Sequence, residues 1–230
     1  MMIRLMKTSA LFSLVIAWLA LGATALRAIP GLPQPAQVEL VAESYTVQSG
    51  QTFYVALDFK LEPHWHIYWK NPGASGLPVE IEWELPDGFT AGAIEWPAPE
   101  RIELGGLMNY GYEDAVTLMV PIRAGKDLIE GEPVMLQAEV GWLMCEEVCV
   151  PGDASLRLEL VVGRAADLSE DAALFAAARA RLPQAALPWE VSATNEDGLL
   201  VLTIEQGAGP EVPKELYFYA DKTGVIDPSA

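Results

Sequence analysis

The residues of this chain best suited to chemistry are its two cysteines, Cys145 and Cys149, which are separated by three residues. They lie within residues 141–152, between two stretches that we expect to be strands. Bonded cysteines need Cα atoms about 4.4–6.8 Å apart, whereas four residues of extended chain span about 13 Å. A disulfide between these two cysteines therefore requires a sharp bend, for which a strand end or a hairpin tip is the natural place.

A disulfide over so short a loop would add little stability. Loop-closure entropy predicts about 2 kcal/mol for a loop of this size, against about 4.7 kcal/mol for a loop of a hundred residues. Reversible exchange suits such a pair better, although spacing alone leaves a passive bridge and a metal site open. Glu146 and Glu147 lie between the cysteines, and their negative charge disfavours a thiolate. We therefore expect the oxidised pair to be the electrophile that a partner's thiolate attacks.

Two histidines, His64 and His66, form a second group that could do chemistry. Residues i and i+2 of a strand share one face, so the pair could hold a metal, and cysteine and methionine sulfurs are suitable ligands for Cu(I). Alternatively, the histidines form the polar side of a strand whose buried side carries Trp65, Ile67 and Trp69. No Ser–His–Asp arrangement, phosphate-binding loop or paired-carboxylate site stands out, and no cofactor is predicted.

Alternating apolar and polar residues predict the strands that would position these groups. The pattern has period 2, with Gly and Pro at the joints, and favours an all-β fold built as an antiparallel sandwich. The expected strands are residues 37–44, 53–61, 79–85, 116–120, 134–140 and 156–162. The last two run into and out of the cysteine segment, which places the cysteines at one end of the sandwich.

One helix should interrupt this pattern. Ser169 is the expected N-cap, residues 172–182 form the helix, and Pro183 ends it. We expect it to pack on the sandwich through one face, made by Leu168, Phe175, Ala178 and Leu182. Beyond it, a second sheet is expected, with strands at residues 189–194, 199–205 and 215–220.

The first 25 residues have the composition of a secretory signal. Arg4 and Lys7 precede an apolar stretch, residues 8–22, and cleavage is expected after Ala25. The alternative, an uncleaved anchor, would need a span of about 20 residues. Export would take the cysteines out of the reducing cytosol and into the periplasm. The expected organisation is then a signal (1–25), a β-sandwich (26–163), a helical linker (164–188) and part of a second β domain (189–230).

The chain is strongly acidic, with a formal net charge of −18. Such a chain should repel nucleic acid and anionic lipid, and no second apolar stretch reaches membrane-spanning length. The acidic charge could attract a basic partner or a cation, or it could be an ordinary solvated surface.

Three stretches together resemble the amino-terminal periplasmic domain of the DsbD-type membrane thiol–disulfide reductases, and most closely the branch of suppressor of copper sensitivity B. They are residues 64–76 (HWHIYWKNPGASG), residues 96–101 with 106–113 (WPAPER and GLMNYGYE), and the cysteine segment with its flanking Trp142 and Pro151-Gly152. The resemblance covers roughly residues 35–163.

This resemblance implies an immunoglobulin-like sandwich with a redox-active cysteine pair. A membrane reductase domain and a thioredoxin-like domain would donate electrons, and oxidised periplasmic proteins would accept them. By the same resemblance, Cys149 would form the mixed disulfide with partners and Cys145 would resolve it. The alternatives are a copper-handling periplasmic protein and an interaction module with a fixed bridge.

The resemblance also implies a cap loop that covers the cysteines. Asn109 stands where the family has a shielding aromatic residue, and the cysteine spacing is shorter than in the better-known relatives. The match places Tyr68 near the cysteines, and Trp142 is expected either in the core or in an apolar collar. The predicted surround of the cysteines is Leu107, Met108, Asn109, Tyr110, Gly111, Tyr112, Tyr68, Trp142, Glu146 and Glu147.

Overall fold

A computed structural model of the protein describes residues 34–184, 189–197, 199–205 and 216–228. The expected signal at residues 1–25 lies outside the described residues. Among those that are described, no helix is long and apolar enough to cross a membrane.

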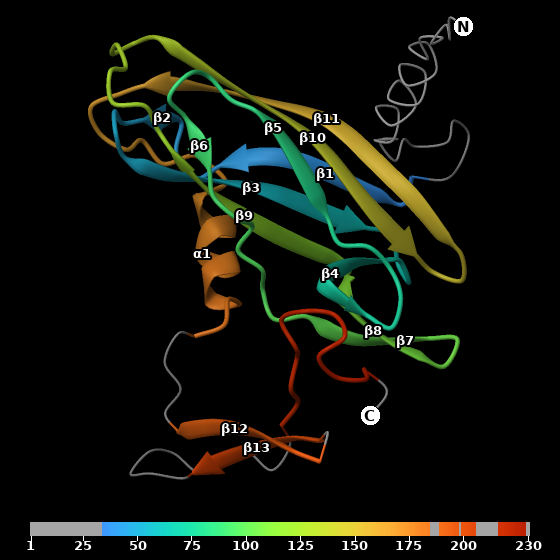
Figure 1. Ribbon diagram of the computed structural model, residues 1–230. Helices are drawn as coiled ribbons and strands as arrows, with labels where there is room; N and C mark the ends of the chain where they lie inside the picture. Colours follow the sequence, from blue (N-terminus) through green and yellow to red (C-terminus); the bar gives the residue numbers. More distant parts are fainter. Residues whose placement is uncertain (1–33, 185–188, 198, 206–215, 229–230) are drawn as a thin grey trace, which may run out of the picture.

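The described strands form two main sheets that face each other, as predicted (Figure 1). The four-stranded sheet has the order β1–β3–β9–β6, with bounds β1 Ala36–Ala42, β3 Thr52–Leu61, β9 Ala115–Arg123 and β6 Thr90–Ala91. The seven-stranded sheet has the order β2–β11–β10–β4–β8–β7, and β5 also pairs with β10. Its bounds are β2 Thr46–Val47, β4 His66–Gly73, β5 Glu80–Glu84, β7 Glu100–Leu104, β8 Leu107–Glu113, β10 Pro133–Cys145 and β11 Cys149–Val162.

The core lies between these sheets and follows the alternation of the sequence. Every second side chain of β10 is buried, from Val134 to Met144. Phe59 of the four-stranded sheet meets Trp142 of the seven-stranded sheet edge to face, with ring centroids 5.3 Å apart. The fold is therefore an all-β, immunoglobulin-like sandwich, and this packing fixes the end of β10 that carries Cys145.

The single described helix, α1 (Ala172–Ala180), packs on the outer face of the four-stranded sheet. Phe175 and Ala178 are buried there against Ala56 and Met119, as the predicted apolar face requires. Two details of the prediction are wrong. Leu168 is 64% exposed, and Ser169 is not the N-cap, because its hydroxyl donates to the carbonyl of Ala42 while Asp171 occupies the cap position.

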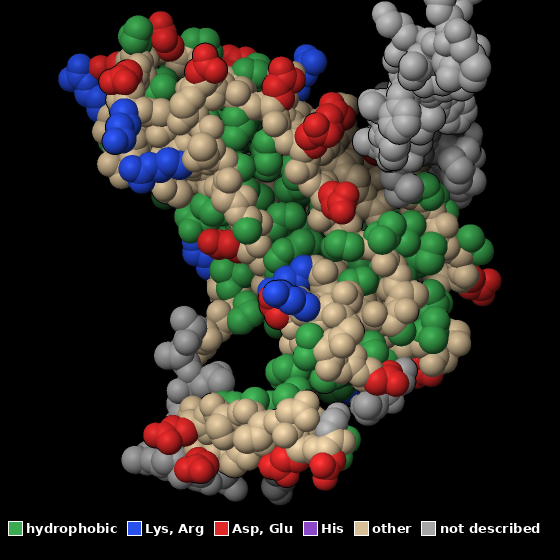
Figure 2. Space-filling view, viewed as in Figure 1, with side chains coloured by type: hydrophobic (Ala, Val, Ile, Leu, Met, Phe, Trp, Pro, Cys, Tyr) green, Lys and Arg blue, Asp and Glu red, His purple; other side chains and the backbone are tan. Residues whose placement is uncertain are grey.

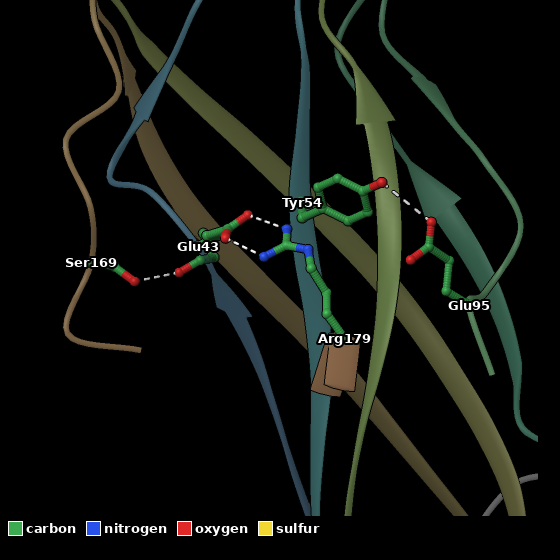
Figure 3. A network of polar contacts seen from close by, with 6 residues as sticks. Glu43, Tyr54, Glu95, Ser169 and Arg179 are labelled. Atoms are coloured by element: carbon green, nitrogen blue, oxygen red, sulfur yellow. Dashed lines mark hydrogen bonds and ion pairs between the residues drawn. The ribbon is translucent and has the colours of Figure 1, made fainter. Parts of the chain in front are cut away.

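Arg179 ties the end of α1 to the sheet through a polar network (Figure 3). Its guanidinium donates two hydrogen bonds to the carboxylate of Glu43 and lies over the ring of Tyr54, 4.8 Å from the centroid. The Tyr54 hydroxyl in turn donates to Glu95. The bidentate geometry holds the helix in one orientation.

Replacing Arg179 with alanine is expected to lower the free energy of unfolding by about 1 kcal/mol, because a paired and stacked guanidinium is lost. The matched control is Arg164→Ala, which breaks the more exposed pair with Glu130 and should cost less than about 0.5 kcal/mol. Urea unfolding midpoints of the two variants provide the measurement. Equal midpoints would contradict the anchoring role.

Beyond α1, the strands β12 (Glu190–Glu196) and β13 (Leu199–Glu205) pair as a separate two-stranded sheet. The third predicted strand is wrong over the described residues 216–220, which have no regular structure. This segment returns to the sandwich instead, where the Asn71 side chain donates to the carbonyl of Ala220 at 2.8 Å. The hydroxyls of Tyr217 and Tyr110 are also 2.8 Å apart.

The acidic side chains are scattered over the face shown in Figure 2, and they are also present on the β12–β13 hairpin. This distribution accords with a solvated acidic surface for that face rather than with one concentrated patch.

Candidate functional site

The two cysteines form a disulfide at the tip of the β10–β11 hairpin. The two strands pair without interruption from Pro133↔Val161 to Cys145↔Cys149, and three residues make the turn. The Cα atoms of the cysteines are 4.1 Å apart, so the chain reverses between them. The predicted bend is therefore the turn of a hairpin.

The two sulfurs of this bridge differ in their access to solvent. Cys145 is fully buried, whereas Cys149 is exposed. The register explains the difference, because β10 lies between β11 and β4 at this point and Cys145 pairs with His66 as well as with Cys149. Cys149 is therefore the cysteine of the bridge that an incoming group can approach from solvent.

Tyr68 on β4 contacts both sulfurs. Its hydroxyl donates to Cys145 Sγ at 2.9 Å and lies 3.7 Å from Cys149 Sγ. The side chain is fully buried, and this burial raises the pKa of Tyr68 above its usual value of 10.0. The phenol therefore keeps its proton at neutral pH and remains a donor to sulfur.

The loop after β4 covers the ring of Tyr68. Gly76 has φ +102°, and a Cβ at this position would overlap the Tyr68 ring. Asn109 secures this loop, because its side-chain oxygen accepts hydrogen bonds from Ser75 N at 3.0 Å and from Ser75 Oγ at 2.9 Å. Asn109 thus holds the segment over Tyr68 in place.

The expected cap loop is instead a strand. Residues 107–112 belong to β8, which pairs with β4 on one side and with β7 on the other. Met108, Tyr110 and Tyr112 pack in or against the sandwich core, and Leu107 is 47% exposed. Gly111 pairs with Tyr68. The aromatic side chain in contact with the sulfurs is therefore Tyr68.

The remaining predicted surround divides between core and surface. Trp142 is buried in the core, which is the first of the two positions expected for it. Met144 is fully buried as well. Glu146 is half-buried and Glu147 exposed in the turn, beside Val148, which is 70% exposed. The turn beside Cys149 thus consists of two acidic residues and one apolar residue, with no basic side chain.

The two histidines do not share a strand face, so this part of the sequence interpretation is wrong. His64 lies in an exposed turn with φ +73°, whereas His66 begins β4 and is only 2% exposed. Within the described residues, no group of three or more His, Cys, Asp or Glu side chains could hold a metal ion.

Pattern analysis failed on β4 because both faces of this strand are covered. The alternation placed Ile67 and Trp69 on a buried face, which is confirmed, and one of its two interpretations made the histidines the polar side of the strand. His66 and Tyr68 are buried instead, under contacts from distant segments. The proximity of Tyr68 to the cysteines, by contrast, was available from the family resemblance.

Replacing Tyr68 with phenylalanine is expected to slow opening of the disulfide about 10- to 100-fold. A hydrogen bond to a charged group contributes about 1.5–3 kcal/mol, and the departing sulfur of Cys145 would lose it. Stopped-flow reduction by dithiothreitol measures the effect. Tyr54→Phe also removes one tyrosine hydroxyl, far from the sulfurs, and should leave the rate unchanged. Equal rates for the two variants would argue against the contribution of Tyr68.

The family profile described as "Thiol:disulfide interchange protein DsbD, N-terminal" matches residues 35–160. No curated protein matches the chain.

Two of the solved structures similar to the chain are the N-terminal domains of ScsB and DsbD. The N-terminal periplasmic domain of ScsB from Proteus mirabilis has 22% sequence identity and a TM-score of 0.57, and the alignment covers 77% of this chain and 66% of that one. The chain thus spans about two thirds of that structure. The reduced N-terminal domain of DsbD from Neisseria meningitidis has 17% identity and a TM-score of 0.31, with 60% and 95% covered.

Proposed function

The chain belongs to the family of the DsbD N-terminal domain, a thiol:disulfide interchange family, and on this premise we propose that it relays electrons through the Cys145–Cys149 pair. The proposed donors are a membrane reductase and a thioredoxin-like domain. The proposed acceptors are periplasmic proteins that contain disulfides. The proposed location is the periplasm, reached through the signal at residues 1–25.

One observation carries this proposal: the bridge joins an exposed cysteine to a buried cysteine whose sulfur accepts a hydrogen bond. A donor thiolate attacks Cys149 Sγ along the axis of the S–S bond. A new bond forms between the donor and Cys149, and the electron pair of the old bond leaves on Cys145 as a thiolate. Tyr68 donates its hydrogen bond to this departing sulfur.

The second half of the reduction releases the donor. A second thiolate of the donor attacks its own sulfur in the mixed disulfide, and Cys149 leaves as a thiolate. The donor is then oxidised and the cysteine pair holds two electrons. Exchange with an oxidised acceptor runs the same steps in reverse, with Cys149 as the attacking group and Cys145 as the resolving one.

A redox titration of the purified chain against glutathione tests the proposal. A relay should have a reduction potential well above the region near −300 mV that is typical of structural disulfides. Reduced thioredoxin-like protein should also reduce the bridge within seconds. A potential below that region, together with no reduction by such a donor, would identify a fixed structural bridge and overturn the proposal.

A further inference from the structure

His66 is a buried imidazole beside the disulfide that the exchange steps above leave without a role. Its side chain is 2% exposed, and its Nε2 atom is buried with no hydrogen-bond partner. An unsatisfied buried polar group costs about 1–3 kcal/mol. Because its burial costs stability, we expect the imidazole to have a role at this position.

The register places His66 directly next to Cys145. His66 pairs with Cys145 on β10 and with Glu113 on β8, and residues paired across strands point to the same face of a sheet. Tyr68 lies two residues further along β4 on this face, and its ring centroid is 5.1 Å from that of His66. The imidazole therefore stands in a row with the buried sulfur, beside the tyrosine that donates to it.

The charged and titratable groups that the strand register and the hairpin turn place near His66 are otherwise acidic or neutral. They are Tyr68 on its own strand, Glu113 on β8, Cys145 on β10, and Glu146, Glu147 and Cys149 at the hairpin tip. The sequence has no Lys or Arg between Lys126 and Arg157, and Lys70, further along β4, forms an ion pair with Asp221. His66 is thus the side chain in this row that can become positively charged next to Cys145.

We infer that His66 is a positioning residue that compensates charge: it binds a proton when the disulfide opens and holds it beside the Cys145 thiolate. This inference rests on the proposed exchange function. When a donor attacks Cys149, the S–S electron pair moves to Cys145 and no electron passes through the imidazole. The imidazole takes one proton from solvent, forming an imidazolium–thiolate pair, and releases it when Cys145 closes the bond again.

The two redox states should therefore protonate His66 differently. In the oxidised protein, burial lowers the pKa of His66 below its usual value of 6.5, so the ring is neutral at pH 7. Reduction places a negative charge on the cysteine paired with His66, and a nearby opposite charge raises the pKa of a histidine. The thiolate is stabilised in turn, which offsets the repulsion from Glu146 and Glu147.

Nuclear magnetic resonance of the histidine side chains tests this without any change to the site. The chain has only two histidines, and His64 in its exposed turn is the internal control. We expect the His66 ring signals to titrate at higher pH after reduction with a phosphine, while those of His64 are insensitive to redox state. His64→Asn assigns the signals. Identical His66 titrations in both states would overturn the inference.

A kinetic experiment tests the same role of His66. We expect His66→Gln to release glutathione from a mixed disulfide at Cys149 about tenfold more slowly at pH 7, with the rate profile moved to higher pH, since glutamine cannot carry the proton that stabilises the attacking Cys145 thiolate. His64→Asn should match the unchanged protein. Superimposable pH profiles for His66→Gln and the unchanged protein would overturn the inference while leaving the proposed function intact. Absence of exchange in the unchanged protein would instead overturn the proposed function.

Discussion

Replacing Cys145 with serine is expected to trap a stable mixed disulfide between Cys149 and a partner thiol. Cys149 is exposed and can still exchange, but no second thiol remains in the chain to release the partner. In Cys149→Ser the remaining sulfur is fully buried behind Tyr68 and between two strands. Because exchange requires access to the sulfur, this variant should form adducts at least about tenfold more slowly.

Intact-mass spectrometry after incubation with oxidised glutathione, sampled over time, measures the two rates. The control is the same reaction in concentrated urea, where burial no longer protects either sulfur and the two variants should react alike. Equal rates in the folded state would contradict the assignment of Cys149 as the attacked sulfur. Faster reaction of Cys149→Ser would reverse the two roles.

Replacing Gly111 with alanine is expected to lower the free energy of unfolding by about 3 kcal/mol. A Cβ at this position would overlap the backbone carbonyl oxygen of Ile67 on β4 and lie 3.2 Å from the side chain of Ile102. A carbonyl in a paired strand cannot rotate away, so β4 and β8 must separate, and overpacking of this kind costs about 1–3 kcal/mol. Since Tyr68 pairs with Gly111, its contact with the sulfurs should be lost too.

Thermal unfolding followed by circular dichroism should show a midpoint about 10 °C lower for this variant. The matched control is Gly141→Ala on strand β10 of the same sheet, where a Cβ would meet no atom within 4 Å. That variant should stay within about 0.5 kcal/mol of the unchanged protein. If both glycine variants unfolded at the same temperature, the close approach of β4 and β8 would not be the reason for glycine at position 111.

The fold and the place of the cysteines were predictable because both depend on local patterns. Period-2 alternation identified the core-facing residues of β3, β9, β10 and β11, although Ala56 and Asp58 on the other face of β3 are buried as well. Close spacing of Cys145 and Cys149 between two such strands required a bend, which the hairpin turn provides. Neighbouring residues determine alternation and turn formation, so a single sequence contains this information.

Only the tertiary structure decided how the two sulfurs differ and what surrounds them. Cys145 is buried because β4 pairs with β10 across 79 positions of sequence, between His66 and Cys145. Tyr68 contacts the sulfur from β4, and Asn109, from another strand, holds the loop over its ring. His66 is buried as well, although one interpretation of the alternation had made it part of the polar side of its strand. The burial of a side chain depends on every segment packed around it, and local periodicity reports only one of them.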